Sequence, residues 1–228
     1  MTIMALSAET PSESENYPDG QVVTTGGTSA PDAVRGQSGR PSLTSRSRIS
    51  AVAIDIFTER GFDQTSVDEI ADAAGIARRT LFRYYPSKNA IPWGDFDSHL
   101  QDMRDLLATI PSETPIAEAL QQALVSFNEV PPDDLDSHRR RMALLLGVPA
   151  LQAHSMLMYA EWRQVIAEFC ATRLGLDRDD HLPQTIGWLC LGTALAAYDQ
   201  WLGHDDADLR ALIVAGSRTL AQGLASLA

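Results

Sequence analysis

Apolar residues recur every three or four positions through nearly all of the chain after residue 44, which is the spacing of one buried helix face. No stretch alternates apolar and polar residues as a half-buried strand would, and no internal repeat is visible. Prolines and glycines interrupt the pattern near residues 111–115, 131–132 and 175. The pattern predicts an all-α protein of about nine helices, over residues 44–61, 67–74, 77–84, 87–108, 116–130, 135–147, 150–174, 182–202 and 206–227.

The first 40 residues lack this pattern. They are rich in serine, threonine, glycine, proline and acidic residues, and they hold few large apolar side chains. Such a segment cannot bury enough apolar surface to offset the entropy lost on ordering. We therefore expect residues 1–40 to be a disordered tail.

Two of the predicted helices are short and follow each other closely, within the stretch TSVDEIADAAGIARRTLFRYYPSK at residues 65–88. Ser66 and Glu69 have the spacing of a capping box at the start of the first helix. Gly75 is suited to end that helix in a left-handed conformation, and Pro86 ends the second. Helix, glycine-containing turn and helix together predict a helix-turn-helix motif.

The second of these helices is unusually basic and aromatic for its length. In a helix-turn-helix the second helix enters the major groove of DNA, where arginine pairs with guanine while hydroxyl and lysine groups bind phosphate. Arg48 belongs to the preceding helix, where phosphate contact and plain solvation explain it equally well. The candidate DNA contacts are Arg48, Thr65, Ser66, Arg78, Arg79, Thr80, Arg83, Tyr84 and Lys88.

At these positions the chain resembles the TetR family of bacterial transcriptional regulators. The resemblance spans about residues 44–95 and is carried by Thr65, Ile70, Ala71, Ala74, Gly75, Ile76, Thr80, Leu81, Phe82, Tyr84, Tyr85, Ser87 and Lys88. Within that family, the version RRTLFRYYPSKNAIPWGDF is most similar to regulators found beside mycofactocin biosynthesis genes in actinobacteria. Two residues depart from the family pattern: Ala77 stands where a capping serine is usual, and Phe82 replaces a tyrosine.

The resemblance implies an architecture and a set of partners. It implies an N-terminal three-helix DNA-binding domain, here residues 41–90, and a C-terminal helical domain for ligand binding and dimerisation, here residues 91–228. It implies a homodimer joined through the last two helices and bound to a pseudo-palindromic operator in double-stranded DNA. It also implies a cytoplasmic protein that a small-molecule effector controls, and a Tyr84 that faces DNA while Tyr85 packs inward.

The distribution of charge agrees with one DNA-facing surface. The chain has a net charge of −12, of which residues 1–39 carry −4, residues 40–95 carry +1 and residues 96–228 carry −9. The region with the helix-turn-helix is the one that is not acidic. An acidic body repels DNA phosphate and therefore orients the molecule by its head.

No arrangement of catalytic or metal-binding residues is evident. Cys170 and Cys190 lie in apolar contexts outside any CxxC or Cys/His cluster, and we expect both to be buried free thiols. The GxSxG, HExxH and phosphate-loop patterns do not occur, so we predict no enzyme activity, no catalytic residue, no cofactor and no metal. No apolar run reaches about 18 residues and the first residues do not form a secretory signal, so we expect no membrane contact.

The body offers a candidate effector pocket. Flexible methionines and large aromatics suit an adaptable apolar cavity, although each of these residues fits an ordinary core as well. Arg139, Arg140 and Arg141 have two readings: a cluster at the mouth of the pocket for an amphipathic anion such as an acyl-coenzyme A, or a solvated face paired with nearby aspartates. The candidate lining residues are Met103, Phe127, Met142, Met156, Tyr159, Trp162 and Trp188.

Taken together, these patterns predict a ligand-responsive, sequence-specific DNA-binding regulator. We expect a repressor that a small apolar or amphipathic effector, such as an acyl-coenzyme A, releases from its operator. The alternative is a helical small-molecule binding protein whose DNA-binding head is vestigial.

Overall fold

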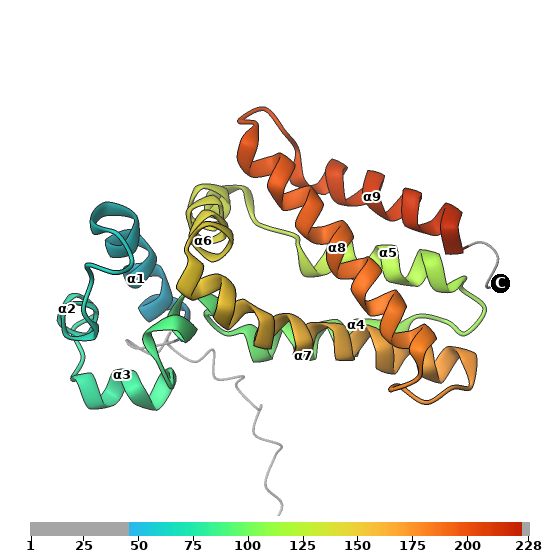
Figure 1. Ribbon diagram of the computed structural model, residues 1–228, viewed down its shortest axis with the longest axis horizontal. Helices are drawn as coiled ribbons and strands as arrows, with labels where there is room; N and C mark the ends of the chain where they lie inside the picture. Colours follow the sequence, from blue (N-terminus) through green and yellow to red (C-terminus); the bar gives the residue numbers. More distant parts are fainter. Residues whose placement is uncertain (1–45, 225–228) are drawn as a thin grey trace, which may run out of the picture. The chain divides into compact units, whose positions relative to one another are not determined.

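Helices are the only regular elements among residues 46–224, which are the residues that the computed structural model describes (Figure 1). The all-α prediction is confirmed over this part of the chain, whereas the predicted disordered tail at residues 1–40 lies outside it. The elements are α1 (Arg46–Arg60), α2 (Val67–Ala73), α3 (Arg78–Tyr84), the 3-10 helix η1 (Lys88–Trp93), α4 (Phe96–Thr109), α5 (Ile116–Phe127), the 3-10 helix η2 (Pro132–Asp134), α6 (Leu135–Gly147), α7 (Pro149–Leu174), α8 (His181–Gly203) and α9 (Leu209–Leu224).

Helices α1, α2 and α3 pack around a core that includes Phe57, Ile70 and Leu81, and to which Leu151 of α7 also contributes. The predicted capping box is present: the backbone nitrogen of Glu69 donates to Ser66 Oγ at 3.2 Å, and the Ser66 nitrogen donates to Glu69 Oε2 at 2.7 Å. These bonds satisfy amide groups that the first turn of α2 would otherwise leave unpaired. We call α1–α3 the head and α4–α9 the body.

The turn between α2 and α3 depends on Gly75, whose φ is +68°. This left-handed conformation lets the Ile76 nitrogen donate to the Ala71 carbonyl at 2.9 Å, which closes the end of α2. A side chain with a Cβ is strained there whatever the free space, and nothing lies within 4 Å of where that Cβ would be. The turn therefore favours glycine because of the positive φ at residue 75, and not because a side chain would lack space.

A matched pair of substitutions tests this conclusion. We expect Gly75→Ala to lower the free energy of unfolding by about 1 kcal/mol, because alanine is unfavourable at positive φ. Gly147→Ala, in α6 with equally open surroundings, should instead leave stability unchanged or raise it by up to about 1 kcal/mol. Urea unfolding followed by circular dichroism measures both, and equal effects at the two positions would contradict the argument.

The single helix predicted over residues 87–108 is wrong, because the structure divides this segment into η1 and α4. Pro92 has no backbone N–H to donate, and Gly94 adopts φ +64°, which ends the 3-10 helix before Phe96. A Cβ at Gly94 would lie 3.7 Å from Ser50 Oγ in α1 and 4.0 Å from a terminal nitrogen of Arg141 in α6. The connection between head and body therefore passes through a tight, glycine-dependent bend.

Lys88 is the one lysine among the 18 basic residues of the chain. Its ammonium group donates to the carbonyl oxygens of Phe62 and Thr65, at 2.8 and 2.9 Å, and lies 4.2 Å from the centre of the Phe62 ring. These contacts fasten the start of η1 to the loop between α1 and α2. Lys88 thus holds the head together from inside.

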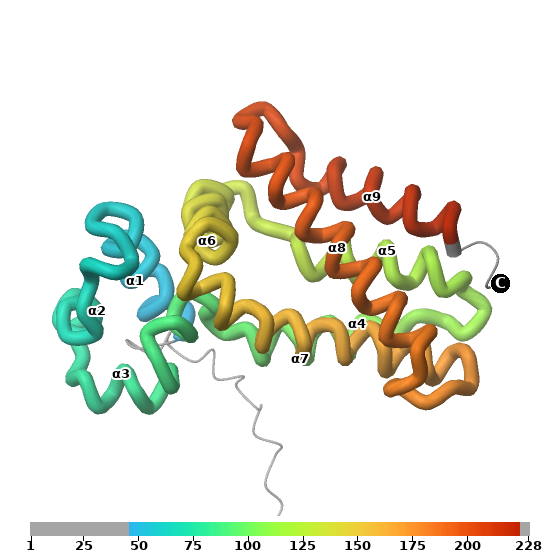
Figure 2. Tube along the Cα trace, viewed as in Figure 1, coloured from blue at the N-terminus to red at the C-terminus, as the bar shows by residue number. Residues whose placement is uncertain are grey.

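The body packs around a second core, to which helices α4–α9 all contribute. Helix α8 lies along α7 and also contacts α9, which in turn contacts α5 (Figure 2). Cys170 and Cys190 are buried free thiols in this core, as expected. No single described helix has the length and apolar character of a membrane span, although the pair Pro132–Gly147 and Pro149–Leu174, bent by 98°, has them when taken together.

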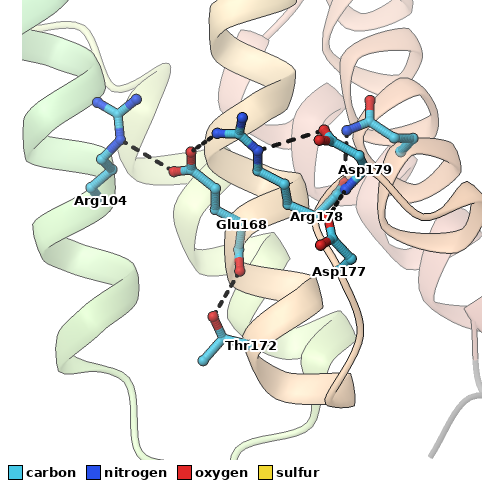
Figure 3. A network of polar contacts seen from close by, with 7 residues as sticks. Arg104, Glu168, Thr172, Asp177, Arg178 and Asp179 are labelled. Atoms are coloured by element: carbon cyan, nitrogen blue, oxygen red, sulfur yellow. Dashed lines mark hydrogen bonds and ion pairs between the residues drawn. The ribbon is translucent and has the colours of Figure 1, made fainter. Parts of the chain in front are cut away.

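A polar network holds the connection between α7 and α8 (Figure 3). The carboxylate of Glu168 lies 3.6 Å from Arg104 of α4 and 3.3 Å from Arg178, whose Nε lies 3.5 Å from Asp179. All of these side chains are at least a third exposed, so each pair stabilises the fold only slightly. The network ties three segments together on the surface of the body.

Candidate functional site

The outer face of α3 carries a group of exposed cations. Arg79 and Arg83 are exposed, and the Arg83 guanidinium lies 5.5 Å from the centre of the Tyr84 ring. Among residues 46–224 Arg79 has no ion-pair partner. Its charge is therefore available for a ligand at this surface.

Arg78 is in a different situation from Arg79. Its Nη1 lies 2.7 Å from Asp68 Oδ2 in α2, and its guanidinium lies 5.5 Å from the centre of the exposed Phe82 ring. An anion that approaches Arg78 must compete with Asp68. The amino end of α3 has no side-chain cap, as the alanine at position 77 predicted.

Three other candidate contacts have structural roles. The Thr65 side chain is 1 % exposed and its hydroxyl donates to the Gly61 carbonyl, so it cannot reach an external ligand. Lys88 is held by two carbonyl groups, and Ser66 is occupied by the capping box. The sequence identified these residues by their residue type and their place in the helix-turn-helix, which do not separate residues that support the motif from residues that touch DNA.

The remaining candidates differ in their exposure, and their contact with DNA stays a prediction. Arg48 is exposed on α1, and Thr80 and Tyr84 are half-buried on α3. Tyr85 is 2 % exposed and its hydroxyl donates to the Arg46 carbonyl at 2.7 Å. Adjacent tyrosines therefore divide between the surface and the core of the head.

A cavity of about 610 Å³, open to solvent on one side, lies in the body and extends to the head, because the exposed residues Ser47 and Ala51 of α1 form part of its wall. Its remaining wall comes from η1, α4, the end of α5, the α5–α6 connection, α6, α7 and α8. Five of the predicted residues line it: Met103, Phe127, Met142, Tyr159 and Trp162. This size is within the range of small-molecule sites in proteins.

The other two predicted lining residues are outside the cavity. Met156 is 52 % exposed and Trp188 is 50 % exposed, and the Arg163 guanidinium lies 3.5 Å from the Trp188 ring centre. Helices α7 and α8 carry apolar residues on several faces, so periodicity does not show which apolar face turns inward. For this reason the sequence did not show that Met156 and Trp188 lie outside the cavity.

Aromatic rings form much of the cavity wall. Trp93 meets Phe96 with ring centres 4.9 Å apart and Tyr159 at 5.7 Å, and Phe127 meets Phe96 at 6.2 Å and Trp162 at 6.0 Å. All four contacts are edge-to-face, which is a favoured geometry for aromatic pairs. Trp93 and Phe96 are not among the lining residues predicted from the sequence, because they flank the bend at Gly94 and the apolar spacing predicts a continuous helix there.

A chain of hydrogen bonds crosses one side of the cavity. The Tyr198 hydroxyl donates to Asn128 Oδ1 at 2.9 Å and lies 2.9 Å from His138 Nε2. Because the hydroxyl proton is directed to Asn128, His138 Nε2 must carry the proton that it donates to Tyr198. Burial, and then the nearby charges of Arg141 and His99, lower the pKa of His138 to about 4, so the imidazole is neutral near pH 7.

The three consecutive arginines of α6 have different surroundings, so they form neither one cluster at the pocket nor one face paired with nearby aspartates. Arg139 donates to the Trp201 carbonyl at 2.8 Å and lies 3.7 Å from Asp205. Arg140 reaches the head, where it lies 3.1 Å from Asp55 of α1. Only Arg141 lines the cavity, where burial lowers its pKa.

Groups of three or more His, Cys, Asp or Glu side chains that could hold a metal ion are absent from the described residues.

The chain matches two models of one protein family. Residues 49–91 match the model described as bacterial regulatory proteins, tetR family, and residues 114–225 match the MftR C-terminal domain. A Mycobacterium tuberculosis protein assigned as the mycofactocin biosynthesis transcriptional regulator MftR is 49 % identical over 186 residues, which cover 82 % of this chain and 94 % of that protein.

Solved structures show the same fold. The FadR repressor of Thermus thermophilus, in complex with lauroyl-CoA, is 24 % identical with a TM-score of 0.54 over 78 % of this chain and 94 % of that one. The FadR regulator of Bacillus subtilis, in complex with stearoyl-CoA, is 17 % identical with a TM-score of 0.56 over 77 % of this chain and 97 % of that one.

Proposed function

The chain belongs to the TetR family of bacterial transcriptional regulators, and from this premise we propose that it is a repressor that an effector releases from its operator. The observation that carries the proposal is the exposed basic surface of α3 in a head of helix-turn-helix form. Residues 41–90 form the DNA-binding domain, and residues 91–228 bind the effector and the second subunit.

The repressor acts as a homodimer joined through α8 and α9. Support comes from the outer surfaces of these two helices, which expose Leu189, Gly192 and Ala196 on α8 and Ala215 on α9. Small and apolar residues allow helices of two subunits to approach closely. Two α3 helices related by a twofold axis then read a pseudo-palindromic operator, with half-sites about 34–36 Å apart or more.

The effector is a small apolar or amphipathic molecule that occupies the aromatic cavity, and acyl-coenzyme A esters are the first class to test. The apolar rings around the cavity support the choice, as do the acyl-CoA complexes of the two FadR proteins with the same fold. The genes under control are those of mycofactocin biosynthesis, by analogy with the relative from M. tuberculosis.

Release follows from unequal affinity of the effector for two arrangements of head and body. A ligand shifts such an equilibrium only by the difference between its affinities for the two states. Ser47 and Ala51 of α1 belong to the cavity wall, so an occupant touches the head directly. Filling the cavity favours a spacing of the two heads that no longer fits the operator.

A titration of the protein against DNA from its own upstream region tests the proposal. We expect binding at least about 10³-fold tighter than to random DNA of equal length at the same salt concentration, and weaker at higher salt. Adding dodecanoyl-coenzyme A should release the specific complex. Equal, weak binding to both DNAs would instead favour the alternative, a small-molecule binding protein with a vestigial head.

A further inference from the structure

The cavity wall contains a half-buried cation without an ion-pair partner among the described residues. Arg141 lines the cavity, its Nε atom is buried, and that atom has no hydrogen-bond partner among the residues that the structure describes. No ion pair within 4.0 Å joins Arg141 to any acid in residues 46–224, although the cavity wall includes Asp102, Glu129 and Asp134. Partial removal of this charge from water lowers the pKa of Arg141 and is unfavourable unless an anion compensates it.

A second donor in the same wall also lacks an acceptor. The indole nitrogen of Trp93 is buried and unpaired, and indole can only donate. The nearby imidazole of His138 is neutral and its Nε2 proton is already bound to Tyr198, so it does not compete for an anion. The cavity wall therefore offers the Arg141 guanidinium, set among apolar rings, to an occupant that brings its own acceptor, whereas the shielded Trp93 nitrogen can take part only after its ring moves.

Arg141 also stands at the junction of head and body. A Cβ at Gly94 would lie 4.0 Å from an Arg141 nitrogen and 3.7 Å from the hydroxyl of Ser50, a fully buried residue of α1. Ser47, which lies three residues before Ser50 on α1, is part of the cavity wall. An anion held by Arg141 would therefore lie beside the bend that connects the DNA-binding head to the body.

We propose that the effector is an anion with an apolar body, and that its acidic group, a carboxylate or a phosphate, pairs with Arg141 inside the cavity. This inference rests on the proposed effector site and specifies the chemistry that the site recognises. Guanidinium is suited to either group because it donates two parallel hydrogen bonds to two oxygens. The apolar body of the effector lies against Phe96, Phe127 and Trp162. The charge of Arg141 then favours ligands that carry an acidic group over neutral ligands of the same apolar shape.

Three probes with the same twelve-carbon chain test the inference by calorimetry on the full chain: dodecanoate, dodecanoyl-coenzyme A and the neutral methyl dodecanoate. We expect at least one anion to bind about 10- to 100-fold more tightly than the methyl ester. Arg141→Met should remove that preference, and Arg141→Gln is the second variant. Arg104→Met is the matched control, because Arg104 pairs with Glu168 on the surface and lines no part of the cavity.

The thermal unfolding of the same proteins excludes a merely structural role. If Arg141 is a binding group, the ligand-free Arg141→Met protein unfolds at the same temperature as the parent or higher, because a half-buried charge without an ion-pair partner has been replaced by an apolar group. The anion should raise the unfolding temperature of the parent and of Arg104→Met, but not of Arg141→Met. A lower unfolding temperature of ligand-free Arg141→Met and Arg141→Gln, with the preference for anions retained, overturns the inference.

The pattern of binding identifies the acidic group. Arg141-dependent binding of dodecanoate assigns a carboxylate, and Arg141-dependent binding of the coenzyme A ester alone assigns a phosphate. Equal affinity of the parent for the methyl ester and both anions, or binding of neither anion, refutes the inference. Operator binding is measured on the same samples. Release of the operator by the neutral ester refutes the inference and leaves the repressor function standing. Failure of the parent to bind its operator, with Arg141-dependent anion binding intact, refutes the repressor function and leaves the inference standing.

Discussion

An Arg79→Ala variant is expected to bind its operator about 10- to 100-fold more weakly than the parent, which corresponds to about 1–3 kcal/mol. Arg79 is exposed on α3 and has no ion-pair partner in the described part of the chain, so its guanidinium can contact DNA without first breaking an ion pair within the protein. Arg78 must first leave Asp68, at 2.7 Å, and that competition lowers what it contributes. We therefore expect the loss for Arg78→Ala to be the smaller of the two.

The nature of the Arg79 contact follows from how the loss depends on sequence and salt. A base contact weakens binding to the operator and relaxes the preference at one base pair, whereas a phosphate contact weakens binding to all sequences and lowers the salt slope by about one. Gel-shift titrations at two salt concentrations measure both. Arg104→Ala, which removes an exposed arginine from the body, is the control and should bind as the parent does; unchanged affinity of Arg79→Ala would remove Arg79 from the interface.

A Lys88→Met variant is expected to lose about 2–3 kcal/mol of unfolding free energy in the head. The ammonium group satisfies the carbonyl oxygens of Phe62 and Thr65 and contacts the Phe62 ring, and methionine keeps the apolar stem while it removes the donor. Hydrogen bonds from a charged donor contribute more than neutral ones, and a carbonyl left without its donor is unfavourable. Urea unfolding of the variant measures the loss.

Arg83→Met provides the comparison for Lys88. Arg83 is an exposed cation of the same head and contacts the Tyr84 ring, so its removal should change stability by less than about 0.5 kcal/mol. If Lys88 were instead a phosphate contact, Lys88→Met would unfold like the parent, and only its affinity for DNA and the salt slope would fall.

The head was largely predictable because its signals are local. Ser66 and Glu69 are three residues apart, Gly75 ends the helix that they begin, and the structure shows both features. The bend at Gly94 was missed because Pro92 is tolerated in the first turn of a helix, and the apolar spacing continues on both sides of it. The helix is interrupted because Gly94 adopts a positive φ, and Ser50 and Arg141 pack beside this residue.

The cavity was predictable only in part, because its wall is assembled from distant segments. Consecutive helix residues are turned by about 100° from each other, so Arg139, Arg140 and Arg141 separate as soon as α6 forms. Which of them faces inward depends on Trp201 and Asp55, more than sixty residues away in one case and more than eighty in the other. The link between His138, Tyr198 and Asn128 likewise spans the body and has no sequence signal.

The use of a single lysine gives this protein an unusual chemical property. Reagents that acylate primary amines find one side-chain target in 228 residues, and that target is held by the carbonyl groups of the loop before α2. Lys88 reacts only when this loop opens, since its nitrogen must first leave the two oxygens and lose a proton. The rate at which the Lys88 side chain itself is acylated, measured apart from the α-amino group of the chain, therefore reports how often this loop opens, on the same principle as the exchange of a protected amide hydrogen.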